Sequence, residues 1–313
     1  MTYHTKYRPV RITNSAAGWL LPACFLFFLS LTFNRGYGQG HKVVRVGIFT
    51  DCQYCDCKPD GNRHYRLSLS KLDKCVVEFN SQSLDGVFHL GDMIDHDYRS
   101  YDSILPRFRK FTAPLHLVLG NHDYMIKKKV KPGLLEHIGM KEDHYVVDLA
   151  DWRFIVLNGD DLSFSAPQDR EHKNERYDMV NDLYSQLEFN ALPWNGGIGK
   201  AQMGWLEMQL DASQRAHKKV IILCHFPLYT KTNHNLFNNK EVFALISKFD
   251  CVKAYFNGHY HSGDYKVMNG IHLVNFRGMV DTDHNAFAVV TLTDDSILIK
   301  GYGREPDRVL KIR

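Results

Sequence analysis

The stretch Val43–Gln53 reads VVRVGIFTDCQ, an apolar run that ends on a carboxylate and an amide. Valine, isoleucine and phenylalanine in such a run favour a strand buried on both faces. Asp51 and Gln53 follow where this strand is expected to end. Because ligands bind beyond the carboxyl ends of strands in open α/β sheets, the stretch predicts an α/β fold with a site at that edge.

The same pattern, an apolar run followed by polar residues, recurs along the chain. The later apolar runs are 86–90, 115–119, 220–224 and 252–256. The polar clusters after them are Gly91-Asp92-Met93-Ile94-Asp95, Gly120-Asn121-His122-Asp123, His225 and Gly258-His259-Tyr260-His261. Carboxylates, amides and imidazoles gathered at the ends of successive strands predict a shell for two metal ions.

The segments between these runs alternate between helix and strand. Helical spacing is found at 64–80, around 101–111, at 199–216 and at 240–249. Further strands are expected at 144–149, 152–157, 265–268, 271–275, 286–293 and 296–301. Residues 158–199 are polar and read as a long insertion, helical near 177–189. We expect a single domain over 39–313, with two sheets face to face and helices outside.

The first 38 residues differ from the rest. Basic residues between positions 6 and 11 precede an apolar segment, 16–33, and the small residues Gly36 and Gly38 follow. This order is typical of a secretory signal peptide, 1–38 here, and predicts an exported protein, periplasmic or secreted. No stable membrane association is expected after cleavage. The alternative is an N-terminal membrane anchor, because the apolar segment is near the lower length limit of a spanning helix.

Composition adds two constraints. The chain of 313 residues is 44% hydrophobic and 24% charged, as in ordinary soluble domains, and its net charge of +4 is too small to indicate a nucleic acid partner. Beyond the signal the cysteines are Cys52, Cys55, Cys57, Cys75, Cys224 and Cys251. The dense spacing from Cys52 to Cys57 leaves a third metal site, a disulfide and unpaired cysteines all open.

The polar clusters suit one reaction in particular. Two ions about 3.5–4 Å apart hold both the attacking and the leaving oxygen of a phosphoryl transfer. Such a pair needs a bridging carboxylate, and Asp92 is expected to serve, directly after a strand and a glycine. Oxygen and imidazole ligands without thiolate suit Mn, Fe, Zn or Co rather than a soft metal.

These motifs together resemble the signature of the calcineurin-like metallophosphoesterase superfamily. Within it the chain is most similar to the manganese-dependent ADP-ribose/CDP-alcohol diphosphatases, on GNRHYRLS at 61–68, WNGGIG at 194–199 and GREPDR at 303–308. The similarity spans 43–313. It implies a four-layer αββα sandwich of two mixed sheets flanked by helices.

The resemblance also implies roles for single residues. One ion would be held by Asp51, Gln53, Asp92 and His261, and the other by Asp92, Asn121, His225 and His259. His122 would face the substrate phosphate and stabilise charge or protonate the leaving group. A hydroxide bridging the ions would attack the phosphorus in line. The implied cofactors are two divalent ions, manganese first, with Fe, Zn or Mg as alternatives.

Two positions depart from the wider superfamily pattern. Gln53 replaces the usual histidine, and Asp123 replaces the usual glutamate. A neutral oxygen donor at Gln53 is expected to shift the preference toward harder ions such as manganese. Asp95 is expected to support its loop rather than to bind metal.

Substrate contacts are predicted from basic and aromatic residues. The basic candidates for a second phosphate are Arg63, His64, Arg66, Arg304 and Arg308, with surface positions or structural salt bridges as the alternatives. Phe226 and Tyr229 are candidates for stacking on a base, or for core packing.

The predicted function is hydrolysis of the phosphoanhydride in small nucleoside-diphosphate-linked compounds such as ADP-ribose and CDP-alcohols. The alternative is a cyclic-nucleotide phosphodiesterase, or another phosphomonoesterase or phosphodiesterase of the same superfamily. A non-catalytic module is disfavoured, because every expected ligand position is filled. The oligomeric state is not predicted.

Overall fold

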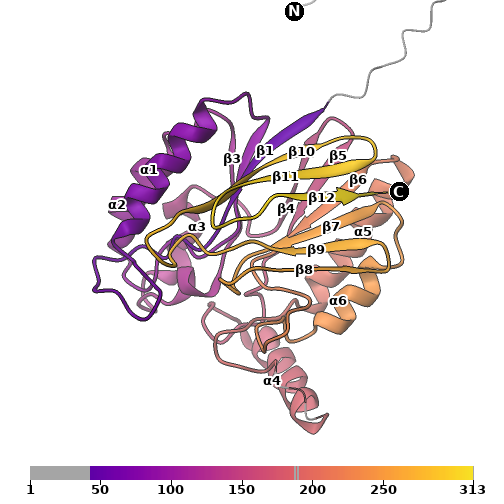
Figure 1. Ribbon diagram of the computed structural model, residues 1–313. Helices are drawn as coiled ribbons and strands as arrows, with labels where there is room; N and C mark the ends of the chain where they lie inside the picture. The colour runs from indigo at the N-terminus through magenta and orange to yellow at the C-terminus, as the bar shows by residue number, and fades with distance from the viewer. Residues whose placement is uncertain (1–42, 187, 189, 313) are drawn as a thin grey trace, which may run out of the picture. The chain divides into compact units, whose positions relative to one another are not determined.

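The computed structural model describes residues 43–186, 188 and 190–312, which belong to one compact unit (Figure 1). The predicted signal peptide lies outside the described residues. Within the described ranges, no helix has the length and apolar character needed to cross a membrane.

The first of two six-stranded sheets has the order β12-β11-β10-β1-β2-β3. Its strands are β1 (Val44–Phe49), β2 (Gly86–His89), β3 (Leu115–Leu117), β10 (Ala286–Leu292), β11 (Ser296–Gly303) and β12 (Arg308–Lys311). β1 pairs in parallel with β2, and β2 with β3, whereas β10 runs antiparallel to β1. The carboxyl ends of β1, β2 and β3 therefore meet at one edge of the sheet.

The second sheet has the order β4-β5-β6-β7-β9-β8. Its strands are β4 (Tyr145–Leu149), β5 (Trp152–Val156), β6 (Lys219–Leu223), β7 (Val252–Asn257), β8 (Asp264–Met268) and β9 (Ile271–Asn275). Its central strands β6 and β7 are parallel. The ends of these two strands supply the remaining predicted metal ligands.

Helices cover the outer faces of both sheets (Figure 1). They are α1 (Leu67–Asn80), α2 (Ser100–Phe108), α3 (Leu134–Ile138), α4 (Arg170–Ser185), α5 (Lys200–Arg215) and α6 (Asn239–Ile246), with short 3-10 turns at Asn121–Tyr124 and Lys131–Gly133. Residues of α1 and α2 share a buried core with the first sheet, and those of α5 and α6 share one with the second. The predicted αββα sandwich is confirmed.

Strand β1 shows how the sequence builds these layers. Val46 and Ile48 point into the core between the sheets, whereas Phe49 packs in the core shared with the helices. Successive side chains of a strand face opposite sides, so an apolar run is buried on both. Gly47 lets α1 come close, because a Cβ there would lie 2.4 Å from the ring of Phe79.

The insertion at 158–199 carries the helix α4, which extends away from the sandwich (Figure 1). None of its residues is buried. The helix begins at Arg170, earlier than predicted, because the carboxylate of Asp169 accepts a hydrogen bond from the backbone N–H of His172 and caps it. The short elements β12 and α3 were not predicted.

Candidate metal centre

The structure brings the predicted ligands together at the carboxyl ends of β1, β2, β3, β6 and β7. Nε2 of His261 lies 3.2 Å from Oδ1 of Asp51. Nε2 of His225 lies 3.2 Å from Oδ2 of Asp92. The donor atoms of Asp92, His225 and His259 all lie within 4.8 Å of one another, close enough to share one ion.

The remaining predicted ligands complete the ring of donors. The side-chain amide nitrogen of Gln53 lies 2.9 Å from Oδ2 of Asp92 and 3.2 Å from Nε2 of His261. Gln53 and Asn121 line the same cavity as His259 and His261. Gln53 therefore lies between the two carboxylate–histidine pairs with its amide nitrogen toward them, and binding an ion through Oε1 requires the amide to turn over.

Several donor atoms of this set are buried without a partner in hydrogen-bond geometry among the described residues. They are Oδ1 of Asp51, Oε1 of Gln53, Oδ1 of Asn121 and Nε2 of His225. Of these, the atoms of Asp51 and His225 make only the ion-pair contacts given above. A buried polar atom without a partner is costly and needs an explanation. Divalent cations would satisfy all of these atoms at once, so the residues present fit two ions.

The charges of the buried carboxylates and imidazoles also fit a site for cations. Burial alone raises the pKa of Asp92, but His225 and His122 outweigh burial and hold that pKa well below its usual value. Burial lowers the pKa of both His225 and His261. The nearby Asp92 outweighs this effect and raises the pKa of His225 to about 10. Asp51 does the same for His261 and raises its pKa to about 9. Without ions, protonated imidazoles thus balance the buried carboxylates.

Each metal-facing histidine is oriented through its other ring nitrogen. Nε2 of His259 lies 3.0 Å from Oδ1 of Asn195. Nδ1 of His261 lies 2.9 Å from Oδ1 of Asp281. Nδ1 of His225 lies 2.8 Å from the carbonyl of Leu90. Partners of this kind fix the tautomer and leave the opposite nitrogen for an ion.

Sequence reasoning missed Asn195 and Asp281 as orienting residues. Asn195 lies in WNGGIG, one of the motifs on which the resemblance to the diphosphatases rests. The buried asparagine of that motif was the available signal. No sequence motif includes Asp281, because only the folded chain brings it next to His261.

Four of the predicted ligands have an unusual backbone. Asp51, Gln53, Asp92 and His259 have φ angles of 51°, 39°, 58° and 67°. These values lie in the left-handed region, which residues other than glycine seldom adopt. The strand ends therefore turn sharply at the ligands, and the turn aims their side chains at one another.

Asp123 holds two of the ligand loops together. Its carboxylate accepts backbone N–H bonds from Asp92, Met93 and Gly120, each 3.0 Å long. It also accepts the hydroxyl of Tyr101 at 3.0 Å. Gly120 is required there, because a Cβ would lie 2.2 Å from Oδ1 of Asp92. Asp123 thus acts as a structural carboxylate behind the site.

His122 lies beside the donors without joining them. Its backbone N–H donates to Oδ1 of Asp92 at 2.9 Å, and its ring Nδ1 lies 3.1 Å from Oδ1 of Asp95. Burial lowers the pKa of His122, but Asp92 and Asp95 outweigh burial and raise it. The imidazole is therefore held toward its protonated form. The carboxylate of Asp95 contacts the rings of both His122 and His96, and it thereby positions His122.

A cavity of about 270 Å³ opens over these residues. Its lining comprises Gln53, Arg63, Asn121, His122, Met125, Trp194, His234, His259 and His261. Among the basic substrate candidates, only Arg63 is in this lining. Met125, Trp194 and His234 were not singled out from the sequence. Trp194 lies in WNGGIG, which marked the resemblance but no substrate contact, and Met125 and His234 lie in segments far from it in the chain.

The structure does not place the other basic candidates in the cavity lining. Arg66 pairs with Asp56 at 2.5 Å on the surface, and Arg308 pairs with the buried Glu305. Arg304 donates to the backbone carbonyl of Gly278. His64 is tied through its backbone N–H to Val280. For Arg66 and Arg308 the geometry matches the alternative reading, a surface position and a structural salt bridge.

The two aromatic candidates for base stacking are also outside the cavity lining. Phe226 is fully buried in the core between the second sheet and its helices. Tyr229 packs against that core. Nζ of Lys266 lies over the Tyr229 ring, 3.5 Å from the ring centroid. Both positions match the core-packing alternative.

The sandwich fold and this set of donors define a metal-dependent phosphoesterase. The family model described as calcineurin-like phosphoesterase matches residues 44–263, and the chain belongs to that family. Its reaction class is therefore metal-dependent hydrolysis of phosphate esters or anhydrides.

Individual relatives show which members of this family the chain is similar to. The chain is 28% identical over 323 residues to the human manganese-dependent ADP-ribose/CDP-alcohol diphosphatase, covering 88% of this chain and 94% of the human one. It is 28% identical to the rice protein of the same name, covering 85% and 93%. A dimetal phosphatase from Danio rerio has the same fold, with a TM-score of 0.78 at 23% identity, covering 86% of this chain and 99% of that one.

Proposed function

We propose that the chain hydrolyses the phosphoanhydride of nucleoside-diphosphate-linked compounds, such as ADP-ribose and CDP-alcohols, with two manganese ions. The observation that carries the proposal is the cavity in which Arg63 and His122 stand over the buried donor set. The diphosphatase names of the relatives from human and rice support the substrate class.

The proposed ligand assignment is the one that the family resemblance implies. Asp51, Gln53, Asp92 and His261 would hold one ion, and Asp92, Asn121, His225 and His259 the other. Bound there, the ions would supply positive charge to the phosphate oxygens and activate the attacking water. Asp92 suits the shared position, because its Oδ2 contacts both Gln53 and His225.

His122 is the residue that would transfer a proton. Its raised pKa favours an imidazolium, which can donate to the departing phosphate oxygen. Asp95 fixes the ring through Nδ1, so Nε2 is the nitrogen left to reach the substrate. The same charge also stabilises negative charge that develops in the transition state.

Arg63 would bind the second phosphate, which distinguishes a diphosphate from a simple monoester. Its guanidinium keeps a raised pKa in spite of burial, through a hydrogen bond with Tyr65. A guanidinium binds phosphate oxygens through two parallel N–H bonds. At the cavity rim the ring of Trp194 is 45% exposed and lies 6.4 Å from that of His234. These rings offer a surface for the nucleobase.

The test is a hydrolysis panel on metal-stripped protein reloaded with Mn, Mg, Fe or Zn. ADP-ribose and a CDP-alcohol should release AMP and CMP with manganese, and Asp92→Asn should abolish the activity. A chromogenic phosphomonoester and cyclic AMP complete the panel. The proposed substrate class would be refuted if the protein hydrolysed only the phosphomonoester or only cyclic AMP.

The metal preference has its own test. Gln53 offers a neutral oxygen where the wider superfamily has a histidine, so we propose that Gln53→His moves the preference away from manganese toward zinc or iron. Activity titrations with each ion, on wild type and variant, measure this shift. If wild type and variant rank the ions in the same order of activity, Gln53 does not determine the metal preference.

We also propose that residues 1–38 are a signal peptide that directs export of the protein, because basic residues precede an apolar segment there. N-terminal sequencing of the protein recovered from cell fractions tests it. A mature chain starting near residue 39 outside the cytoplasm is expected. An intact N-terminus in the membrane fraction would favour the anchor.

A further inference from the structure

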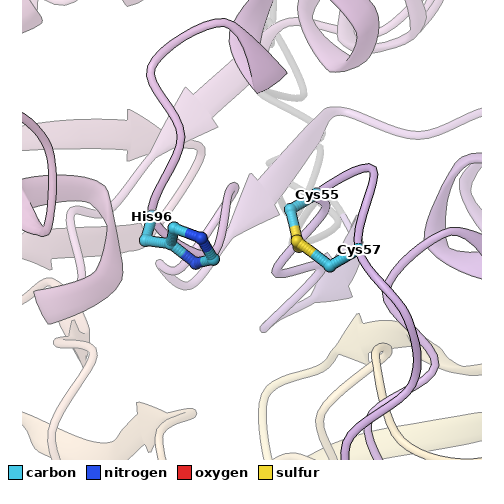
Figure 2. A group of neighbouring side chains, drawn as sticks. All are labelled: Cys55, Cys57 and His96. Carbon is cyan, nitrogen blue, oxygen red and sulfur yellow. A yellow bond between two sulfur atoms is a disulfide. The ribbon is translucent and has the colours of Figure 1, made fainter.

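Cys55, Cys57 and His96 form a second cluster of metal-binding side chains, separate from the donor set above (Figure 2). Their potential ligand atoms all lie within 4.8 Å of one another. In the structure the two cysteines form a disulfide, and His96 faces it from the neighbouring loop. The proposed phosphoesterase reaction uses none of these side chains.

Backbone pairing fixes this arrangement. The loop after β1 and the loop after β2 are joined at Tyr54 and Ile94 by a parallel bridge. The N–H of Tyr54 donates to the carbonyl of Met93, and the N–H of Asp95 donates to the carbonyl of Tyr54, both at 3.2 Å. The residues that follow on each loop are therefore held opposite one another, which places His96 against the cysteines.

Side-chain packing supports the cysteines and orients the histidine. Cys55 is fully buried with Tyr65 and Val280, and Cys57 packs against this group. Nδ1 of His96 contacts Oδ2 of Asp95, which leaves Nε2 for an ion. A carboxylate behind an imidazole in this way is the usual support of a metal-binding histidine.

We propose that Cys55, Cys57 and His96 form a third metal site, which takes a thiophilic divalent cation such as Zn²⁺ only after the disulfide is reduced. Two thiolates and an imidazole suit zinc, whereas the phosphoesterase site offers only oxygen and imidazole donors. Ligand atoms around a tetrahedral zinc lie about 3.5–3.8 Å apart, given bonds of about 2.0–2.3 Å. Once the disulfide is reduced, the two sulfurs must move apart from bonding distance to reach that separation, while His96 stays within 4.8 Å of them.

The chemistry balances in two steps. A dithiol reductant transfers two electrons and two protons to the Cys55–Cys57 disulfide, giving two thiols, and itself becomes a disulfide. The cation then displaces the two thiol protons and bonds to both sulfurs and to His96. Because His96 is 55% exposed, water can fill the fourth position. Asp95 contacts both His96 and His122, so an ion bound here lies two side chains from the proposed proton donor.

Cadmium binding to the full chain tests the proposal. The protein is loaded with manganese, and half is reduced with a dithiol and desalted without oxygen. A thiol assay in denaturant confirms two additional thiols per chain. Cadmium is then titrated into both forms, with dialysis for the bound ion and near-ultraviolet absorption for thiolate bonds. The reduced form should bind one more ion with a thiolate band, and the oxidised form should show no band.

Variants assign the site. Cys57→Ser should abolish the band, and Cys251→Ser, at a cysteine outside the cluster, should keep it. His96→Gln should weaken cadmium binding roughly tenfold or more, whereas His284→Gln at another exposed histidine should not. The His96 variant keeps the test decisive if a cysteine variant fails to fold. Equal uptake in both redox states, or a band that survives Cys57→Ser, would overturn the proposal.

Discussion

Oδ1 of Asp95 lies 3.1 Å from Nδ1 of His122, and the backbone carbonyl of Asp95 lies 2.9 Å from the same nitrogen. One residue thus fixes the imidazole from two directions. The ring is held without occupying Nε2, and its protonated form is favoured. Asp95 acts through His122, as a positioning residue.

Replacement of Asp95 by asparagine should lower kcat about 10- to 100-fold, because the neutral amide no longer favours the imidazolium. Manganese content and KM should change little, since Asp95 contacts no predicted ligand. Steady-state kinetics and metal analysis on Asp95→Asn measure both. Asp97→Asn, at a surface carboxylate paired with Arg99, is the matched control. A rise in KM with kcat unchanged would argue against positioning.

Asn195 should control metal affinity rather than proton transfer. Asn195→Ala removes the oxygen that accepts from His259, and loss of such a partner weakens metal binding about 10- to 100-fold. The manganese dependence of activity measures the change. Asn190→Ala is a control in the same segment, because the Asn190 side chain contacts Leu236 and Asn239 but no ligand. Equal manganese affinity in wild type and Asn195→Ala would refute this role.

Metal uptake should release protons. The pKa values of His225 and His261 are raised to about 10 and about 9 in the ion-free site, so both rings are protonated near neutral pH. A cation needs the neutral imidazole, so manganese affinity should rise with pH up to about 9–10 and be lost as pH falls. Manganese titration of stripped protein in weak buffer with a pH indicator detects the protons. Affinity that does not vary with pH would contradict this account.

Asp160 should make stability depend on pH. Its side chain is fully buried. Burial raises its pKa from 3.8 to about 7, although His225 and the hydroxyl of Ser163 lower it. The folded protein thus keeps a proton that the unfolded chain releases. This contribution to stability is complete below the unfolded pKa and is lost as pH rises through about 7.

Asp160→Asn should therefore raise the free energy of unfolding of the ion-free protein near pH 8, by up to about 4 kcal/mol, with little effect near pH 4. Urea unfolding at the two pH values measures the difference. Asp211→Asn, at a carboxylate half exposed on α5, controls for loss of negative charge. A stabilisation of the same size at both pH values would mean that the gain does not come from the proton.

The sequence predicted most of what depends on local pattern. The buried strands, the two sheets and the clustering of ligands at the strand ends all follow from apolar runs that stop at polar residues. The start of α4 was placed too late, because the cap at Asp169 determines it and the apolar spacing is weak. The short strand β12 depends on pairing with β11, which sequence spacing does not reveal.

What depends on distant partners was not predictable in the same way. Arg66 and Arg308 were chosen for their charge, yet their carboxylate partners Asp56 and Glu305 determine where they point. Conversely, Trp194 and His234 line the cavity, although WNGGIG indicated only a resemblance and no motif surrounds His234. The position of Trp194 depends on how the insertion packs, and that of His234 on the segment between β6 and α6.

The left-handed backbone at Asp51, Gln53, Asp92 and His259 has an evolutionary consequence. Glycine adopts that conformation freely, whereas other residues there cost about 1–3 kcal/mol each. A descendant that no longer bound ions would gain stability by drifting to glycine at any of these positions. Such a descendant would also lose the predicted ligands, so glycine at any of these positions is expected in a relative that has given up ion binding.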